Sequence, residues 1–270
     1  SSLHEDNRGN IFITLTYRDP DYCSDAEYAR GYFIPNDWSL NKKHFQDFMK
    51  RLRYHFGGEI RFFHCGEYGD KCRHKMPVDQ CEVCTVGRPH YHAILFNCSF
   101  DDLEMFGTSK GRILYTSKTL ADIWKYGFVQ VGDVTFESAG YVARYALKKV
   151  TGALADEHYR SVDEDGVLHY VLPEYITMSR RPGLAYEWYQ KYMTDVFPSD
   201  EVPVRGQGIF KSVPRYYEKL LEADDPHMLE EIKELRQVFM AAHADDYTPQ
   251  RLMDRYKVKK AQADMLTRKL

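Results

Sequence analysis

The segment Arg88-Pro89-His90-Tyr91-His92-Ala93-Ile94-Leu95-Phe96 decides how the rest of the chain is interpreted. After a Gly-Arg-Pro turn it runs into β-branched and aromatic residues, which is typical of a strand. Successive side chains of a strand point to opposite faces, so His90 and His92 are expected on one face, about 7 Å apart. Two imidazoles at that spacing can converge on one metal ion. The alternative, one solvated histidine and one core histidine, is the more common outcome for an isolated His-x-His.

The composition indicates a folded protein without a chain-wide basic surface. The chain has 270 residues, 14% of them aromatic, which suits one large folded domain with or without an appendage. Its net charge of −3 provides no chain-wide basic field, so nucleic-acid binding would depend on local patches. We find no apolar run of membrane-spanning length and no signal-peptide pattern, so we expect no membrane partner. Six cysteines without a secretion signal indicate a reducing compartment.

Hydrophobic periodicity and turn residues predict an α+β protein. Strands are expected at residues 11–17, 59–67, 88–97 and 127–134, with a further candidate at 167–172. The first of these is apolar almost throughout, which favours a central position in a sheet. Helices are expected at 39–56, with a Ser or Asn cap and a Gly57-Gly58 end, and at 138–150. Residues 101–125 are expected to form a loop and a short helix. This order predicts a central antiparallel sheet with helices packed on one face of it.

The C-terminal part of the chain predicts a helical extension. A helix is expected at 184–196, and the Pro- and Gly-rich residues 198–214 are typical of a linker. Three more helices are expected at 214–221, at 226–243 and from Thr248-Pro249 onward. We therefore expect one domain over residues 1–197 and a helical extension over 198–270 that packs on it.

Two tyrosines and a lysine share one face of the helix expected at 138–150. Tyr141 and Tyr145 are one helical turn apart, and Lys148 follows three residues later. The alternative is an amphipathic helix that simply packs two tyrosines. A phenol is a poor nucleophile at neutral pH, but it can attack phosphorus beside a divalent metal and a cation. The products would be a phosphotyrosine ester and a free 3′-hydroxyl, and the reverse step would rejoin DNA without ATP.

Taken together, these segments resemble the HUH endonuclease superfamily, in particular the replication initiation proteins of microviruses, the small circular single-stranded DNA phages. Residues 12–16 resemble the first motif of that family, residues 89–92 its metal-binding motif and residues 141–148 its two-tyrosine motif. Residues 178–183 and 214–217 resemble later segments of the phage proteins. The resemblance implies an HUH/RRM-like nuclease fold in which Tyr141 and Tyr145 are catalytic and Lys148 stabilises charge.

The resemblance also implies a function and a setting. The chain would nick and rejoin single-stranded DNA at the replication origin of a circular phage genome, in the cytoplasm of the infected bacterium. Host helicase and polymerase would be its partners. Two rival interpretations remain: a non-catalytic zinc-containing nucleic-acid-binding protein, and another HUH enzyme such as a relaxase or transposase. The first rival leaves the register of the tyrosines unexplained, and the phage-like later segments argue against the second.

A third metal ligand and several phosphate contacts can be named as candidates. Glu67 ends the strand before the His-x-His strand and would lie near it if the two pair; the alternative is a solvated turn glutamate. Two histidines and one carboxylate with open positions suit Mn²⁺ or Mg²⁺. Basic residues near the motifs are candidates for contacts with DNA phosphates, the alternative being ordinary surface charges: Arg88, Arg144, Lys149, Arg180, Arg181 and Arg215.

A second, structural metal site is expected in the insertion at residues 70–87. Cys72, His74, Cys81 and Cys84 give a CxxC pair with another cysteine and a histidine about ten residues away, a spacing typical of a zinc knuckle. Such an insertion needs its own stabilisation, which a Zn²⁺ ion would supply. Cys65 is an alternative to His74 as the fourth ligand.

Overall fold

The computed structural model describes residues 9–69, 86–109, 111–144, 149–162, 166–204, 208–210 and 213–265. They divide into two compact units, the first ending at Leu184 and the second beginning at Ala185. The predicted zinc ligands Cys72, His74, Cys81 and Cys84 lie outside the described residues, as do Tyr145 and Lys148.

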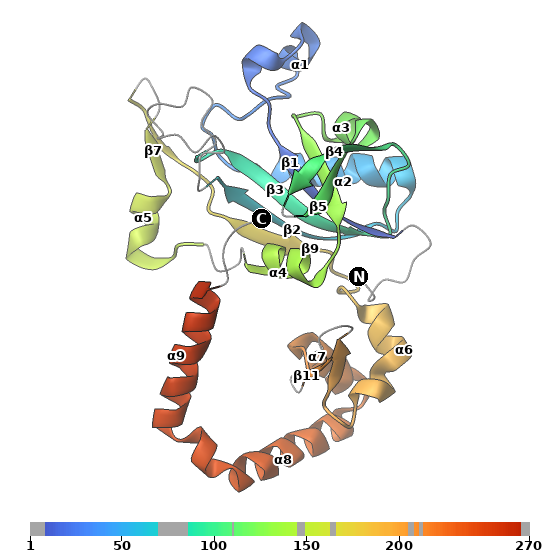
Figure 1. The fold of residues 1–270 in the computed structure, drawn as a ribbon, viewed down its shortest axis with the longest axis vertical. Helices are drawn as coiled ribbons and strands as arrows, with labels where there is room; N and C mark the ends of the chain where they lie inside the picture. Colours follow the sequence, from blue (N-terminus) through green and yellow to red (C-terminus); the bar gives the residue numbers. More distant parts are fainter. Residues whose placement is uncertain are drawn as a thin grey trace. The chain divides into compact units, whose positions relative to one another are not determined.

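The first unit is built on a large antiparallel sheet (Figure 1), as predicted. Its strands are β1 (Asn10–Thr16), β2 (Arg61–Tyr68), β3 (Pro89–Phe96), β4 (Leu103–Ser109), β5 (Arg112–Ser117), β6 (Val129–Asp133) and β9 (Tyr175–Met178). They are ordered β4-β5-β6-β1-β3-β2-β9, and every neighbouring pair is antiparallel. The apolar β1 is central, between β6 and β3, as its sequence predicts.

Helices lie on both faces of this sheet (Figure 1), so the expectation of helices on one face is wrong. Helices α2 (Lys42–Phe56) and α3 (Lys118–Trp124) pack on one face, where alternate side chains of β1, such as Ile13 and Leu15, are fully buried. Helix α4 (Phe136–Arg144) packs on the other face, with Val142 against Ile94 and Cys65. The metal-binding candidates lie on the same face as α4.

The ends of α2 follow from its sequence. The Asn41 side chain accepts a hydrogen bond from the Lys43 backbone N–H at 2.9 Å, which satisfies one of the free donors of the first turn. Gly57, at φ +96°, ends the helix in a conformation that L-residues rarely adopt. Both the asparagine cap and the glycine end are therefore confirmed.

Helix α4 differs from its prediction at both ends. It begins at Phe136 instead of 138, because the Thr135 side chain accepts a hydrogen bond from the Ser138 N–H at 3.1 Å and acts as the cap. Its described part ends at Arg144, and Lys149 and Val150 are not helical. The prediction of a continuous helix to residue 150 is therefore wrong at its C-terminal end.

Several short strands were not predicted. Residues 103–109 and 112–117 pair as the β4–β5 hairpin instead of forming a loop, and β9 adds an edge strand beside β2. Nearly every residue of β4 is exposed and its register shifts between Met105 and Gly107, so no apolar alternation marks it. The candidate strand at 167–172 is present as β8 (Leu168–Tyr170), which pairs with β7 (Arg160–Val162) in a separate two-stranded sheet. Two short helices complete this unit, α1 (Asp25–Ala29) and α5 (Ala155–His158).

The second unit contains the predicted tail helices. It comprises α6 (Tyr186–Val196), α7 (Arg215–Asp224), α8 (Pro226–Ala242) and α9 (Pro249–Met265), with a hairpin of β10 (Val202–Val204) and β11 (Gly208–Phe210) where a linker was expected. Tyr189 and Val196 of α6 are buried with Tyr217 of α7, so α6 belongs here and not with residues 1–184. The packing of this extension on the first unit stays a prediction. No described helix combines the length and apolar character needed to cross a bilayer.

Candidate metal centre

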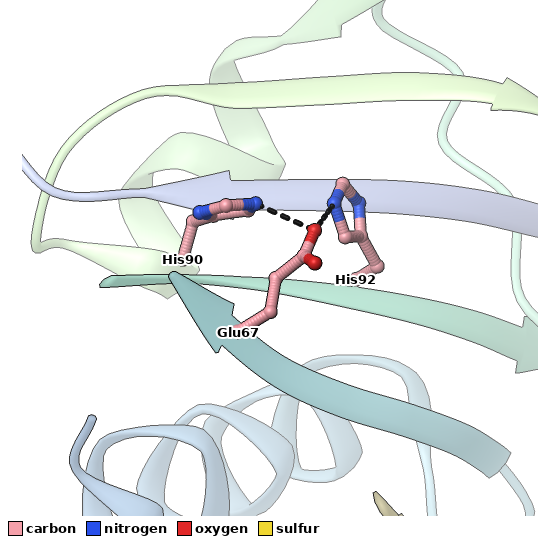
Figure 2. A group of neighbouring side chains, drawn as sticks. All are labelled: Glu67, His90 and His92. Atoms are coloured by element: carbon pink, nitrogen blue, oxygen red, sulfur yellow. Dashed lines mark hydrogen bonds and ion pairs between the residues drawn. The ribbon is translucent and has the colours of Figure 1, made fainter. Parts of the chain in front are cut away.

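Glu67 joins the two histidines of the His-x-His strand (Figure 2). Strands β2 and β3 pair with Glu67 directly opposite His90, so the carboxylate extends along the face that carries both imidazoles. Its Oε1 lies 2.7 Å from His90 Nε2 and 2.9 Å from His92 Nε2. Of the described residues, only these three were found as a group able to hold a metal ion. The predicted convergence of His90 and His92, and the placement of Glu67 beside them, are therefore present in the structure.

The contacts of His90 favour a positive charge on its ring or between its ring and Glu67. His90 Nδ1 lies 3.1 Å from the Arg88 carbonyl oxygen, which can only accept, so Nδ1 carries a proton. In the neutral imidazole, Nε2 would then present a lone pair to the Glu67 carboxylate 2.7 Å away, which is repulsive. A proton on Nε2, or a metal ion bound by both groups, removes that repulsion. Metal-binding histidines commonly donate their other N–H to a carbonyl in this way.

The spacing of the three ligand atoms fits a small divalent cation. In octahedral coordination with bonds of about 2.1 Å, adjacent ligands lie about 3.0 Å apart. The two contacts of Glu67, at 2.7 and 2.9 Å, are close to that value. Three ligands from one sheet face would leave the remaining coordination positions for water or phosphate oxygens.

The two histidines hold the carboxylate in its charged form. Glu67 is only 2% exposed, and burial alone would raise its pKa. The hydrogen bonds and charges of His90 and His92 outweigh burial, so the pKa of Glu67 is lowered. Glu67 is therefore a buried, charged candidate ligand and not a solvated turn residue.

Tyr141 lies beside this centre. Helix α4 packs its Val142 into the sheet, which brings the Tyr141 ring edge-on to His92, with ring centroids 5.2 Å apart. Phe12 also lies against both rings, stacked on His92 at 5.6 Å and edge-on to Tyr141 at 6.4 Å. The first tyrosine of the pair thus has a phenol next to the candidate metal ligands.

Within the first unit, the predicted phosphate-binding residues are not gathered in one place. Arg88 is engaged within the protein, since its guanidinium donates to Asp19 Oδ1 at 2.7 Å and to the Tyr17 carbonyl at 3.0 Å. Arg180 and Arg181 are exposed and follow β9 at the end of β2 remote from Glu67. The others are Arg144, which is half-buried at the end of α4, and the exposed Lys149 and Arg215, the last in the second unit.

Two residues of this face were not singled out from the sequence. Thr14 of β1 is opposite His92, and its Oγ1 lies 2.9 Å from His92 Nδ1. Phe128 is opposite Thr16, whose N–H donates to its carbonyl at 2.9 Å. The alternation of β1 would have identified Thr14 once its pairing with β3 was known. Phe128 is an exposed aromatic at a strand end, which sequence alone does not distinguish from an ordinary surface residue.

Substitution of Thr14 should weaken metal binding. The Thr14→Val change keeps the shape of the side chain but removes the Thr14 hydroxyl beside His92 Nδ1, so the ring loses one of the contacts that fix its orientation. We expect Mn²⁺ affinity to fall by roughly 10- to 100-fold, the usual effect of losing a partner behind a metal ligand. Isothermal titration with Mn²⁺ measures it. Thr16→Val, on the same strand and face, is the matched control, and equal affinities in the two variants would contradict the assignment.

Comparisons with known proteins show which family the chain belongs to. The family model for replication-associated protein ORF2 matches residues 10–76 and 78–150, just over half of the chain. The chain is 32% identical to the replication-associated protein ORF2 of Spiroplasma virus 4, over 84% of this chain and 63% of that protein. It is 32% identical to the replication-associated protein VP4 of Bdellovibrio phage phiMH2K, over 80% and 59%.

A third relative, the replication-associated protein ORF4 of Chlamydia phage 1, is 33% identical over 81% of this chain and 46% of that protein. The chain thus spans between about half and two thirds of the length of these relatives. No solved structure matches it. The matched residues contain β1, the three candidate ligands and α4, so the match covers the site and its supporting strands. The chain belongs to the ORF2 family of replication-associated proteins.

Proposed function

We propose that this chain is a metal-dependent nickase and strand transferase of the HUH type that starts and finishes rolling-circle replication of phage DNA. One observation carries the proposal: the ring of Tyr141 lies 5.2 Å from that of His92, within a group of two histidines and a buried carboxylate. A nucleophile beside a site for a divalent cation is what phosphoryl transfer to a phenol requires. The names of the relatives support a role in phage replication.

The chain's own residues would act as follows. Glu67, His90 and His92 would hold Mn²⁺ or Mg²⁺, which when bound supplies charge stabilisation at the scissile phosphate. The phenol oxygen of a tyrosine attacks phosphorus and the bond to the 3′ oxygen breaks. The phenolic proton passes to solvent, and the departing 3′ oxygen takes up a proton from solvent. The 5′ end is then held as a phosphotyrosine, and the other fragment ends in a 3′-hydroxyl. Attack by a 3′-hydroxyl on that ester reverses the step and rejoins the strand.

A labelled-strand experiment tests this function. Overlapping single-stranded oligonucleotides that tile the viral strand would be incubated with the chain and Mn²⁺, then denatured and separated by size. We expect an oligonucleotide labelled at its 3′ end to yield labelled protein, and the same oligonucleotide labelled at its 5′ end to yield a free labelled fragment. Chelation with EDTA should abolish both. Binding of DNA without any covalent adduct would favour the rival non-catalytic role.

The DNA would cross the open part of the sheet beside the metal centre. Four residues follow one another across the paired strands: Phe128 just before β6, Thr16 of β1, His90 of β3 and Glu67 of β2. Gly127 allows the backbones to approach, since a Cβ there would lie 2.5 Å from the Thr16 carbonyl oxygen. Phe128 is 66% exposed and lies roughly 10 Å from the His90 strand, two strand spacings away. Exposed aromatics on a sheet face stack on the bases of single strands.

The effect of Phe128 on DNA binding can be measured directly. We expect Phe128→Ala to weaken single-stranded DNA binding by roughly 5- to 100-fold, the effect of losing one base stack. Phe128→Trp should restore it. Fluorescence anisotropy measures the affinity, and 2-aminopurine placed in the strand should lose its quenching only in the alanine variant. Tyr54→Ala is the control because that ring, 95% exposed, is on α2 over the opposite face. An effect equal to that of Tyr54→Ala would count against stacking by Phe128.

Basic residues, a zinc site and host proteins complete the proposed function. Arg144, Lys149, Arg180, Arg181 and Arg215 would contact phosphates, as would Arg88 if DNA displaced its internal partners. Residues 70–87 would bind a structural Zn²⁺ through Cys72, His74, Cys81 and Cys84. The protein would act in the cytoplasm of the infected bacterium, on the origin of the circular phage genome, together with host helicase and polymerase.

A further inference from the structure

Three aromatic side chains, Phe12, His92 and Tyr141, contact one another at the metal centre. Phe12 of β1 is stacked on His92, with ring centroids 5.6 Å apart and planes 21° from parallel. Phe12 also lies edge-on to Tyr141 at 6.4 Å, and Tyr141 lies edge-on to His92 at 5.2 Å. All three separations are within the range of attractive aromatic pairs, about 4.5–7 Å. The ring of Tyr141 therefore contacts a candidate metal ligand and also a third ring that contacts the same ligand.

The central strand β1 gives Phe12 a fixed backbone. It pairs with β3 on one side and with β6 on the other, where Phe12 is opposite Ile94 and Gly132. His92 is two residues before Ile94, so its ring is a diagonal neighbour of Phe12, within reach of an aromatic side chain. Thr14, two residues after Phe12 on the same face, lies 2.9 Å from His92 Nδ1. One strand therefore makes both a polar contact and a ring contact with His92.

Helix α4 brings Tyr141 to this ring pair but does not by itself fix the phenol. The start of the helix is held at the end of β6, where the Ser138 hydroxyl lies 3.2 Å from the carbonyl oxygen of Asp133. One turn further on, Val142 is fully buried against the sheet. Tyr141 itself is half-buried, and different χ1 rotamers would carry its hydroxyl to different places while the helix stayed where it is. The contact with the Phe12 ring restricts that rotation.

We infer that Phe12 is a positioning residue for Tyr141: its ring holds the phenol in the orientation from which the phenol oxygen attacks the phosphate at the metal centre. The inference rests on the proposed nicking function, in which Tyr141 is a nucleophile. Phe12 takes no part in the bond changes, because a phenyl ring has no ionisable or nucleophilic group. It acts on the geometry of attack, where a displacement of about 1 Å can cost roughly 100-fold in rate.

A comparison of the two tyrosines separates positioning from stability. A chain with Tyr145→Phe can react only through Tyr141, and a chain with Tyr141→Phe only through Tyr145. We expect Phe12→Leu, which keeps an apolar side chain but removes the ring, to slow adduct formation roughly 10- to 100-fold in the first chain and less than about twofold in the second. An effect through the fold or the metal would slow both chains, because both share them. Rates are measured on a labelled oligonucleotide at saturating Mn²⁺, so a change in metal affinity does not contribute.

Phe63→Leu is the matched control. Phe63 of β2 is opposite Ile94 on the other side of β3 from Phe12, and it packs in the same apolar cluster as Tyr141. Within the described residues, however, its ring has no contact with the rings of His92 or Tyr141. The same substitution at this position removes a ring of the same size from the same cluster. A loss of stability alone would therefore appear in both variants, whereas a selective loss of attack by Tyr141 is expected only with Phe12→Leu.

Fluorine magnetic resonance reports the position of the phenol without the reaction. With Tyr141 alone replaced by 3-fluorotyrosine, in EDTA, we expect Phe12→Leu to move the fluorine resonance toward its value in the urea-unfolded chain and Phe63→Leu to leave it in place. An unmoved resonance in Phe12→Leu, or equal slowing of the two single-tyrosine chains while both still form adducts, would overturn the role of Phe12 and leave the nicking function standing. Absence of adducts from both single-tyrosine chains with Phe12 intact would overturn the nicking function and this role together.

Discussion

A chain carrying both His90→Ala and His92→Ala is expected to lose DNA cleavage by on the order of a thousandfold or more, because a bound metal contributes several kcal/mol to phosphoryl transfer. Glu67 alone cannot replace the lost ligands. The same change should abolish tight binding of Mn²⁺. Adduct formation on a labelled oligonucleotide and titration with Mn²⁺ measure the two effects.

Stability has to be separated from metal binding in this experiment. Removing both imidazoles leaves the Glu67 carboxylate buried without the partners that lower its pKa, so the free energy of unfolding should also fall. Adding Glu67→Gln to the double variant removes that buried charge and should recover part of the stability without recovering cleavage. His227→Ala, with a side chain 85% exposed in the second unit, is the control. Normal nicking by the double variant would refute a metal site at these residues.

The candidate ligands could be predicted because they depend on local pattern. The alternation of β3 places His90 and His92 on one face whatever the rest of the fold is, and the pairing of β2 with β3 then brings Glu67 to them. Thr14 depends on a different fact, the register of β1 against β3, which pairs residues 78 positions apart in the chain. No local pattern encodes that register, so Thr14 as the partner of His92 Nδ1 appeared only in the structure.

The strength of the local sequence pattern also explains which strands were not predicted. Strand β1 is apolar and central, and α2 has an asparagine cap and a glycine end, so both have strong local signals. Strand β9 has four residues, and it is defined by its hydrogen bonds to β2 instead of by an apolar face. Exposed edge strands lack the buried face that produces alternation.

The remaining prediction concerns why two tyrosines, Tyr141 and Tyr145, are four residues apart in this chain. One phenol suffices for a single nick, but finishing a round requires cutting the regenerated origin while the first 5′ end is still held. We propose that one tyrosine holds that end as a phosphotyrosine and the other attacks the new junction. The freed 3′-hydroxyl then attacks the first phosphotyrosine and closes the circle. The position of Tyr141 beside His92 supports this role for the first tyrosine, and Lys148 would stabilise the negative charge of either ester.

Tyr141→Phe and Tyr145→Phe are therefore each expected to retain partial nicking of a short oligonucleotide, and the double variant should form no adduct. Closure of a circle after a full round should need both phenols, because each single variant can hold one end but cannot then cut the second junction. A gel assay for adducts and a circularisation assay on an origin-containing strand measure the two activities. At position 141, phenylalanine keeps the ring that packs on Phe12 and His92, so loss of activity would report the hydroxyl and not the fold. If one single variant lost all cleavage while the other behaved normally in both assays, one tyrosine would be the sole nucleophile and the alternating mechanism would be wrong.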